Sequence, residues 1–209
     1  MSTRSGRTRS SARRGGLVPL MVPRRSGLYA SPEAFWNLCA VNDEMRLERS
    51  ARGEVIAMWP AGADSGMRNA DLTGQLHVWS RADGTGVVFD SNAGFTLPNG
   101  AVRAPDASWI ARNRWLALPK EDRLRFAPIC PDFVVELVSP SDVLANQRKK
   151  MREYLEQGAR LGWLLDPRTG LAEVYRPGAE PESLDRPANL SGEGVLPGFV
   201  LDLRDILSD

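Results

Sequence analysis

Hydrophobic and polar positions alternate along several short segments of the chain, and this period of two predicts β-strands. The clearest case is Phe-Val-Val-Glu-Leu-Val at residues 133–138, an almost continuous apolar run typical of a strand at the centre of a sheet. Because side chains alternate along a strand, Glu136 shares one face with Val134 and Val138, and the other face is entirely hydrocarbon. The pattern therefore places one acid inside an apolar strand.

Helical periodicity and turn residues predict the other elements. Ser31-Pro32-Glu33 opens a helix to about residue 42, a second helix covers 67–80, and Ser139–Asp142 caps a third that runs to about 157. Further strands are expected at 46–49, 53–59, 87–90, 94–97, 102–110, 161–165 and 171–175. Hairpin turns fall at Arg52-Gly53 and at Pro98-Asn99-Gly100, and the polar residues 177–192 are predicted to form a loop.

This order of elements predicts an α/β fold, with a mixed sheet flanked by helices. Its core is αβββαβ, preceded by an N-terminal helix and a β-hairpin. The crossover at 132–165 predicts that its two strands are parallel and its connection right-handed. We expect one domain at residues 30–209 and a basic, disordered tail at 1–29.

The charge of the chain is divided unevenly. Residues 1–30 hold seven arginines and no acid, so the rest of the chain has 20 basic and 26 acidic residues, a net charge of −6. Such a tail can hold nucleic acid through its phosphates; alternatively it is only disordered, or it precedes a true start at Met21. No apolar run is long enough for a membrane span, and we expect a cytoplasmic protein. Cys39 and Cys130 are expected to be buried thiols.

His77 is the only histidine, which excludes a two-histidine metal site and leaves little room for a Ser-His-Asp triad. We expect His77 to be a packing residue on its helix. Catalysis would therefore depend on carboxylates and lysine.

Glu136 needs a partner, because charged side chains are seldom buried alone. An arginine in a buried salt bridge is one solution, and the helix that follows offers another. At about 100° per residue, Lys150 lies at the edge of the apolar arc that contains Met151 and Tyr154, whereas Lys149 points to solvent. Ten residues of helix run back about 15 Å, whereas Glu136 lies about 7 Å before the end of its strand, and a lysine side chain can span the difference.

A second acid, Asp106, lies in the preceding strand region. Two acids at one edge of a sheet repel each other unless a divalent cation or a cationic side chain neutralises them. Two carboxylates beside an ammonium group suit a magnesium-dependent phosphodiesterase, so Asp106, Glu136 and Lys150 are the candidate catalytic residues. Glu48 and Asp132 are weaker candidates, Asp132 because it lies about 13 Å from Glu136 along the strand. Candidates for nucleic-acid contacts are Arg148 and Lys149.

These residues, in this order of elements, resemble the restriction-endonuclease-like superfamily with the PD-(D/E)XK motif. More narrowly, residues 30–209 resemble the Uma-type family of putative bacterial restriction endonucleases. The matching stretches are Gly-Glu-Val-Ile-Ala-Met-Trp-Pro (53–60), Gly-Phe-Thr-Leu-Pro-Asn-Gly (94–100), Ala-Pro-Asp-Ala-Ser-Trp-Ile (104–110), Pro-Asp-Phe-Val-Val-Glu-Leu-Val-Ser-Pro-Ser-Asp (131–142) and Gly-Trp-Leu-Leu-Asp-Pro (162–167).

The resemblance implies an enzyme that hydrolyses DNA phosphodiester bonds with Mg²⁺ or Mn²⁺. In it, Asp106, Glu136 and the backbone carbonyl of Leu137 hold the metal, and the lysine assists the nucleophile. The chain departs from the motif at its lysine position, which is Val138, and Lys150 from the following helix fits a known variation. The family often has a histidine early in the helix before the core strands, but residues 66–69 contain none.

Two other functions remain open. The fold can serve as a non-catalytic module that binds nucleic acid or a protein partner, because fold does not fix function. A metal-dependent hydrolase that acts on another phosphate or on a small molecule is a third possible function. If the protein cuts both strands of DNA, a homodimer would supply the two sites.

Overall fold

The computed structural model describes residues 28–43, 45–58 and 62–208. The predicted tail at 1–29 lies outside the described residues except for its last two positions. These two residues contact residues 54 and 55: the amide of Val55 donates to the carbonyl of Leu28 at 2.7 Å, and Tyr29 forms an antiparallel bridge with Glu54.

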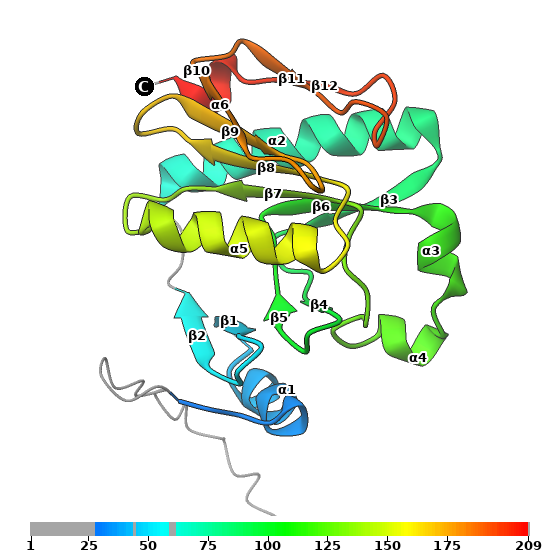
Figure 1. The fold of residues 1–209 in the computed structure, drawn as a ribbon. Helices are drawn as coiled ribbons and strands as arrows, with labels where there is room; N and C mark the ends of the chain where they lie inside the picture. The colour runs from blue at the N-terminus through cyan, green and yellow to red at the C-terminus, as the bar shows by residue number, and fades with distance from the viewer. Residues whose placement is uncertain (1–27, 44, 59–61, 209) are drawn as a thin grey trace, which may run out of the picture.

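A six-stranded mixed sheet forms the centre of the molecule (Figure 1). Its order is β10-β9-β8-β7-β6-β3. The pair β7 and β8 is parallel, as the crossover through α5 predicts, and every other neighbouring pair is antiparallel. The strands are β3 (Gly86–Asp90), β6 (Ala107–Ala111), β7 (Phe133–Leu137), β8 (Leu161–Asp166), β9 (Leu171–Tyr175) and β10 (Glu182–Asp185).

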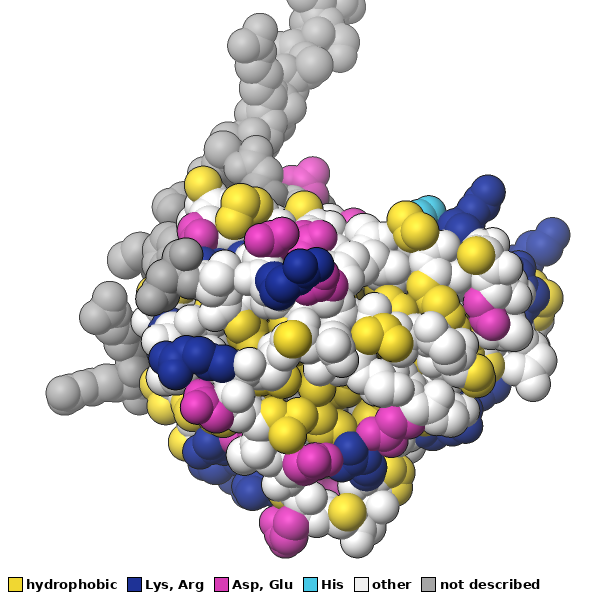
Figure 2. Space-filling model, turned by 90° about the horizontal axis from the view of Figure 1, so that it is seen from above, with side chains coloured by type: hydrophobic (Ala, Val, Ile, Leu, Met, Phe, Trp, Pro, Cys, Tyr) yellow, Lys and Arg dark blue, Asp and Glu magenta, His cyan; other side chains and the backbone are white. Residues whose placement is uncertain are grey.

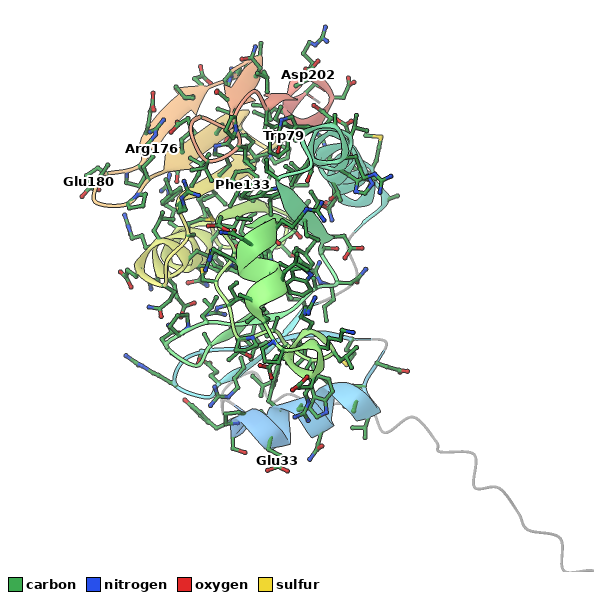
Figure 3. All side chains as sticks on the ribbon, turned by 90° about the vertical axis from the view of Figure 1, so that its right-hand side faces the viewer. Glu33, Trp79, Phe133, Arg176, Glu180 and Asp202 are labelled. Atoms are coloured by element: carbon green, nitrogen blue, oxygen red, sulfur yellow. The ribbon has the colours of Figure 1, made fainter. Side chains whose placement is uncertain are left out.

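Helices cover the two faces of this sheet. The long helix α2 (Ala63–Asp83) packs on one face together with the C-terminal elements, and α5 (Leu144–Glu156) packs on the other. Figure 3 shows Trp79 and Phe133 between α2 and the sheet. The C-terminal elements are β11 (Asn189–Ser191), β12 (Val200–Asp202) and α6 (Arg204–Leu207). Together, α2, β3, β6, β7, α5 and β8 form the predicted αβββαβ core.

A second, four-stranded sheet lies below α5 in the view of Figure 1. Its order is β2 (Val55–Met58), β1 (Arg46–Arg49), β5 (Val102–Arg103) and β4 (Phe95–Thr96). The predicted hairpin of β1 and β2 is confirmed, and Gly53 takes the left-handed φ of +90° that its turn requires. The helix α1 (Pro32–Val41) packs against this sheet, whose β4–β5 hairpin touches the α5 face of the larger one.

The helix starts show where local sequence is decisive and where it is not. At α1 the prediction is confirmed: Ser31 Oγ accepts a hydrogen bond from the Ala34 amide at 3.2 Å, and Pro32 follows. At α5 it is wrong, because the N-cap is Val143 and makes no side-chain cap. Asp142 instead accepts a hydrogen bond from the Ser139 amide at 2.8 Å, so its carboxylate closes the preceding loop.

Other predicted bounds also need correction. The segment 102–110 is two strands, β5 and β6, which belong to different sheets. The second helix is longer than predicted at both ends, and the region 177–192 contains β10 and β11. Two short helices were not among the predicted elements, α3 (Arg112–Ala117) and α4 (Lys120–Arg123). For the strands, pairing with partner strands decides these bounds, and local periodicity does not record it.

The surface over α2 and the C-terminal strands carries hydrophobic side chains among charged ones (Figure 2). Val78 and Val200 are exposed there, beside a groove lined in part by Trp79 and Phe199. His77 is exposed on α2, so its predicted packing role is wrong. Cys130 is buried and Cys39 partly buried, and both are free thiols. Within the described ranges, no helix is long and apolar enough to cross a membrane.

Candidate active site

The pairing of β6 with β7 brings two acids from distant parts of the chain together. Ala107 lies opposite Val135 in this antiparallel ladder, and the same register continued by one residue sets Asp106 opposite Glu136. Directly opposed residues project to the same face of a sheet, with Cβ atoms about 5 Å apart. A hydrogen bond of 2.9 Å from the Leu137 amide to Asp106 Oδ2 fixes the Asp106 carboxylate against β7.

Close packing of α5 on the same face brings Lys150 over these acids. Gly162 of β8 allows the approach, because a Cβ at this position would lie 2.6 Å from Met151 Cε. Met151 and Tyr154 are fully buried beneath the helix, as its apolar arc predicts. Lys150 follows at the edge of that arc, with 11 % of its side chain exposed.

Lys150 joins two carboxylates from different sheets. Its Nζ lies 2.8 Å from Glu136 Oε1 and 2.8 Å from Glu48 Oε1. One helical turn later, the Tyr154 hydroxyl donates to Glu136 Oε1 at 3.0 Å. The side chain of Glu136 is thus held by two donors from α5, and β1 contributes a third acid to the same cluster.

Arg103 and a backbone amide hold Glu48 in place. Arg103 Nη1 lies 3.0 Å from Glu48 Oε2, and the Ala104 amide donates to Glu48 Oε1 at 3.0 Å. Arg103 also donates from Nε to Glu153 Oε2 at 2.7 Å. These contacts connect β1, the β5–β6 connection and α5 around Glu136.

Arg46 completes the charged cluster on its more open side. Its Nη1 lies 3.6 Å from Asp106 Oδ1, and its Nη2 donates to the Ala104 carbonyl at 3.2 Å. Three acids, Glu48, Asp106 and Glu136, and three cationic side chains therefore meet between the two sheets, and Glu153 is a further partner of Arg103.

Burial and charge separate the three acids in their proton affinity. Burial raises the pKa of Glu136 to about 7; Asp106 and Glu48 contribute to the rise, and Lys150 opposes it. Burial also raises the pKa of Asp106, and neither the Leu137 amide nor the charges of Lys150 and Arg46 fully offset it. Burial would likewise raise the pKa of Glu48, but Lys150 and Arg103 hold it below its usual value.

Lys150 remains protonated in this environment. Burial alone would lower its pKa, but the charges of Glu136 and Glu48 and their hydrogen bonds raise it above the usual value. Burial raises the pKa of Tyr154, and the neighbouring acids add to this effect. At neutral pH the two α5 residues are therefore hydrogen-bond donors, and neither is poised to act as a base.

The second-tier candidate Asp132 lies outside this cluster. Its Oδ2 accepts a hydrogen bond from the Ala111 amide at 2.9 Å, and its Oδ1 lies 2.8 Å from Arg114 Nη1 and 3.8 Å from Arg160 Nη1. It marks the opposite end of β7 from Glu136. These contacts give Asp132 a structural role at the start of the strand.

The three consecutive basic residues of α5 point in different directions. Lys150 enters the cluster, Arg148 pairs with Glu173 of β9, and Lys149 is exposed. Glu173 is buried and also accepts a hydrogen bond from the Tyr175 hydroxyl at 2.6 Å. Arg148 thus neutralises a buried acid, and Lys149 keeps its charge in solvent.

Residues 66–69 of α2, where the family often has a histidine, include an arginine with a structural role. Arg68 donates from Nη1 to the carbonyls of Ile206 and Ser208, both at 2.6 Å, and pairs with Asp64 at 2.9 Å. These bonds tie α2 to the end of the chain. Because α2 covers the face of the sheet opposite Glu136, this contact lies away from the charged cluster.

The donor set of the cluster fits a hard divalent cation. Asp106 and Glu136 are opposed oxygen donors, and burial raises the pKa of each carboxyl, so the neighbouring donors and cations do not fully replace the solvation that each carboxylate has lost. In the described part of the chain, no group of three His, Cys, Asp or Glu side chains could hold a metal ion. Mg²⁺ does not need three, since it commonly takes one or two carboxylates plus water and phosphate oxygens.

Three residues of the cluster, Arg46, Arg103 and Tyr154, are not predicted site residues. Tyr154 carries a usable signal, because it follows Lys150 by four residues and so lies on the same side of the helix. Arg46 and Arg103 carry none, because β1 and β5 meet only in the tertiary structure.

Comparisons with known proteins agree with this architecture. A family model, Uma2, described as "Putative restriction endonuclease", matches residues 32–204. The chain is similar to a crystal structure of a putative nuclease belonging to DUF820 from Anabaena variabilis, with a TM-score of 0.71 and 21% identity. That similarity covers 85% of this chain and 97% of the other, and it concerns the fold. The search of curated proteins gave no match.

Proposed function

Because the chain belongs to the Uma2 family of putative restriction endonucleases, we propose that it is a metal-dependent endonuclease that hydrolyses DNA phosphodiester bonds. The observation that carries the proposal is the opposed pair Asp106 and Glu136, each with a raised pKa, beside the ammonium group of Lys150. Buried carboxylates with a raised pKa suit the binding of a cation, and a buried lysine suits the binding of a phosphate group.

Asp106, Glu136 and the backbone carbonyl of Leu137 would hold Mg²⁺ or Mn²⁺. When bound, such an ion polarises a phosphate and makes water a stronger nucleophile. The protein contributes the fixed positions of the ligands. The Leu137 amide orients Asp106, and Lys150 and Tyr154 orient Glu136.

Lys150 would stabilise charge. Its raised pKa keeps it protonated, so its ammonium group can orient the attacking water or neutralise charge that develops on the phosphate. Glu48 holds this ammonium group from the other side at 2.8 Å. In this proposal Glu48 is therefore a positioning residue.

In this proposal DNA would approach the site alongside α5. Lys149 is exposed and can contact a DNA phosphate. Arg148 would contribute less, because its guanidinium is already paired with Glu173.

Supercoiled plasmid tests the proposal. Wild-type protein should convert it to nicked or linear forms in Mg²⁺ or Mn²⁺ and not in EDTA. Asp106→Asn should cut at least about 100-fold more slowly, because it removes a proposed ligand rather than a group that supports one. Glu54→Gln is the matched control, since Glu54 is an exposed acid outside the cluster and should leave the rate unchanged. Equal rates for wild type and Asp106→Asn would refute the proposal.

Calorimetric titration with Mg²⁺ distinguishes the metal-dependent functions from a non-catalytic binding function. Wild-type protein should bind Mg²⁺ with measurable heat, and Glu136→Gln should bind it much more weakly. If wild type binds DNA but neither binds Mg²⁺ nor cuts, the non-catalytic function is the better description.

A further inference from the structure

The three cations of the cluster differ in how fully their donors are used. Lys150 makes two contacts of 2.8 Å with carboxylates, and Arg103 makes two of 3.0 and 2.7 Å. Their side chains are only 11 % and 10 % exposed. Both are committed to the protein's own acids.

Arg46 is different on each of these counts. Its nearest described carboxylate oxygen, on Asp106, is 3.6 Å away, which is too far for a good hydrogen bond. Its Nε is buried and finds no hydrogen-bond partner among the residues that the structure describes, and its bond to the Ala104 carbonyl uses Nη2. The donors left for an incoming group are therefore on Nη1 and Nη2. The side chain is 32 % exposed, so the guanidinium keeps donors that an incoming group can use.

Arg49, three residues further along β1, shows what a structural arginine looks like in this fold. Its Nε donates to the Ala30 carbonyl at 2.7 Å and its Nη1 to the Gly100 carbonyl at 2.6 Å. Short bonds to carbonyls on both sides tie three segments together. Arg46 has one longer bond of this kind, so a purely structural role does not account for its position.

The location of Arg46 also suits an anionic ligand. Of Glu48, Asp106 and Glu136, Asp106 is the most exposed, with 18 % of its side chain accessible, and Arg46 is the most exposed of the three cations, so the cluster opens where Arg46 and Asp106 lie. A phosphate that enters here brings negative charge toward two acids. It requires a cation on that side, and a planar guanidinium offers two parallel donors to phosphate oxygens.

We propose that Arg46 is the phosphate-binding side chain of this site and donates to the non-bridging oxygens of the DNA phosphate beside Asp106. The inference rests on the proposed nuclease function and deepens it, because it names the group that holds the substrate. Arg46 then contacts substrate directly, whereas Arg103 acts through Glu48.

DNA binding by fluorescence anisotropy tests the role of Arg46 without cleavage. A fluorescein-labelled duplex is titrated with wild type, Arg46→Gln, Arg46→Lys and Arg81→Gln in EDTA and in Ca²⁺, between about 50 and 200 mM salt. Arg81 is the matched control, because it is exposed on α2 across the sheet from the site. Thermal melting of each variant verifies that it is folded.

Loss of one phosphate contact should reduce the slope of log K against log salt by about 0.9. We expect this reduction for Arg46→Gln, together with about tenfold weaker binding at the lowest salt. Arg46→Lys should keep the slope of log K against log salt but bind DNA more weakly than wild type, because lysine keeps the charge and lacks the two parallel donors of the guanidinium. Arg81→Gln should match wild type.

An Arg46→Gln slope equal to that of wild type overturns the inference, whatever happens to cleavage. Plasmid cleavage in Mg²⁺ on the same samples keeps the two proposals apart. Wild type that cuts, with an unchanged slope for Arg46→Gln, refutes the role of Arg46 alone. If wild type does not cut, but its salt slope is steeper than that of Arg46→Gln, the nuclease function alone is refuted. If wild type neither binds DNA nor cuts it, both proposals are refuted.

Discussion

The two faces of the central sheet use the same strand for opposite purposes. On the α2 face, β7 presents Phe133, Val135 and Leu137 to an entirely hydrophobic cluster. On the α5 face it presents Val134 and Glu136, and a charged cluster adjoins the hydrocarbon. Both faces are buried, so the difference is in chemistry and not in exposure.

Burial stabilises the α2 face without any directional requirement, since apolar area contributes roughly in proportion to its size. Burial of charge on the α5 face costs free energy that ion pairs and hydrogen bonds must offset. The raised pKa of Glu136 indicates that this offset is incomplete. We therefore expect the α2 face to contribute stability, and the α5 face to hold a charge arrangement suited to function at some cost in stability.

The largest effect should come from the α2 face. Phe133 is fully buried and meets Trp163 edge to face, with ring centroids 4.7 Å apart. Phe133→Ala should lower the free energy of unfolding by about 4 kcal/mol, because it leaves a cavity in a packed core. Urea denaturation measures the loss, and Val78→Ala at an exposed position should change it by less than about 0.5 kcal/mol. A loss below about 1 kcal/mol would contradict tight packing of this face.

On the α5 face, removal of the Lys150 ammonium group should lower the free energy of unfolding by nearly as much. Lys150→Met leaves Glu48 and Glu136 buried without their shared partner and should destabilise the protein by about 3 kcal/mol. Without Lys150 both carboxyls have a higher pKa in the folded state, so the loss should be greatest at alkaline pH and shrink as acid protonates them. Lys149→Met, the exposed neighbour, is the matched control. Equal urea midpoints for the two variants would mean that the ion pairs contribute nothing.

The smallest predicted effect concerns the pH dependence of Glu136. Its pKa is about 7 in the folded protein and ordinarily 4.5, so the folded state holds an extra proton between these values and gains stability as pH falls through this range. Glu136→Gln removes this dependence. Relative to wild type, the variant should gain about 2 kcal/mol in unfolding free energy from about pH 5 to about pH 8.

Urea denaturation across this pH range measures the Glu136 effect, with Glu54→Gln as a control for the loss of one exposed acid. A difference between Glu136→Gln and wild type that does not vary with pH would show that Glu136 titrates as an ordinary glutamate. The inference that ion pairs and hydrogen bonds only partly offset the cost of buried charge on the α5 face would then be wrong.

Much of the fold could be predicted because local patterns and the tertiary structure agree. The alternation in 133–138 gives the two faces of β7, and Ser31 with Pro32 gives the start of α1. The apolar arc of α5 gives the inward direction of Lys150. The errors have two sources. At Asp142 a different local hydrogen bond forms, to the Ser139 amide, so the carboxylate closes a loop instead of capping α5. At β10, pairing with β9 holds a polar segment as a strand.

The sequence by itself determined which residues of β7 and α5 face the core, because alternation and helical period are properties of the local backbone. It therefore singled out Glu136 as an acid in an apolar strand and Lys150 as a lysine at the edge of a buried helix face. Only the tertiary structure decided which distant groups meet them. The antiparallel register sets Asp106 opposite Glu136, and the second sheet brings Glu48, Arg103 and Arg46 to the same place. Such contacts depend on strand pairing between segments far apart in the chain, and no local period encodes that pairing.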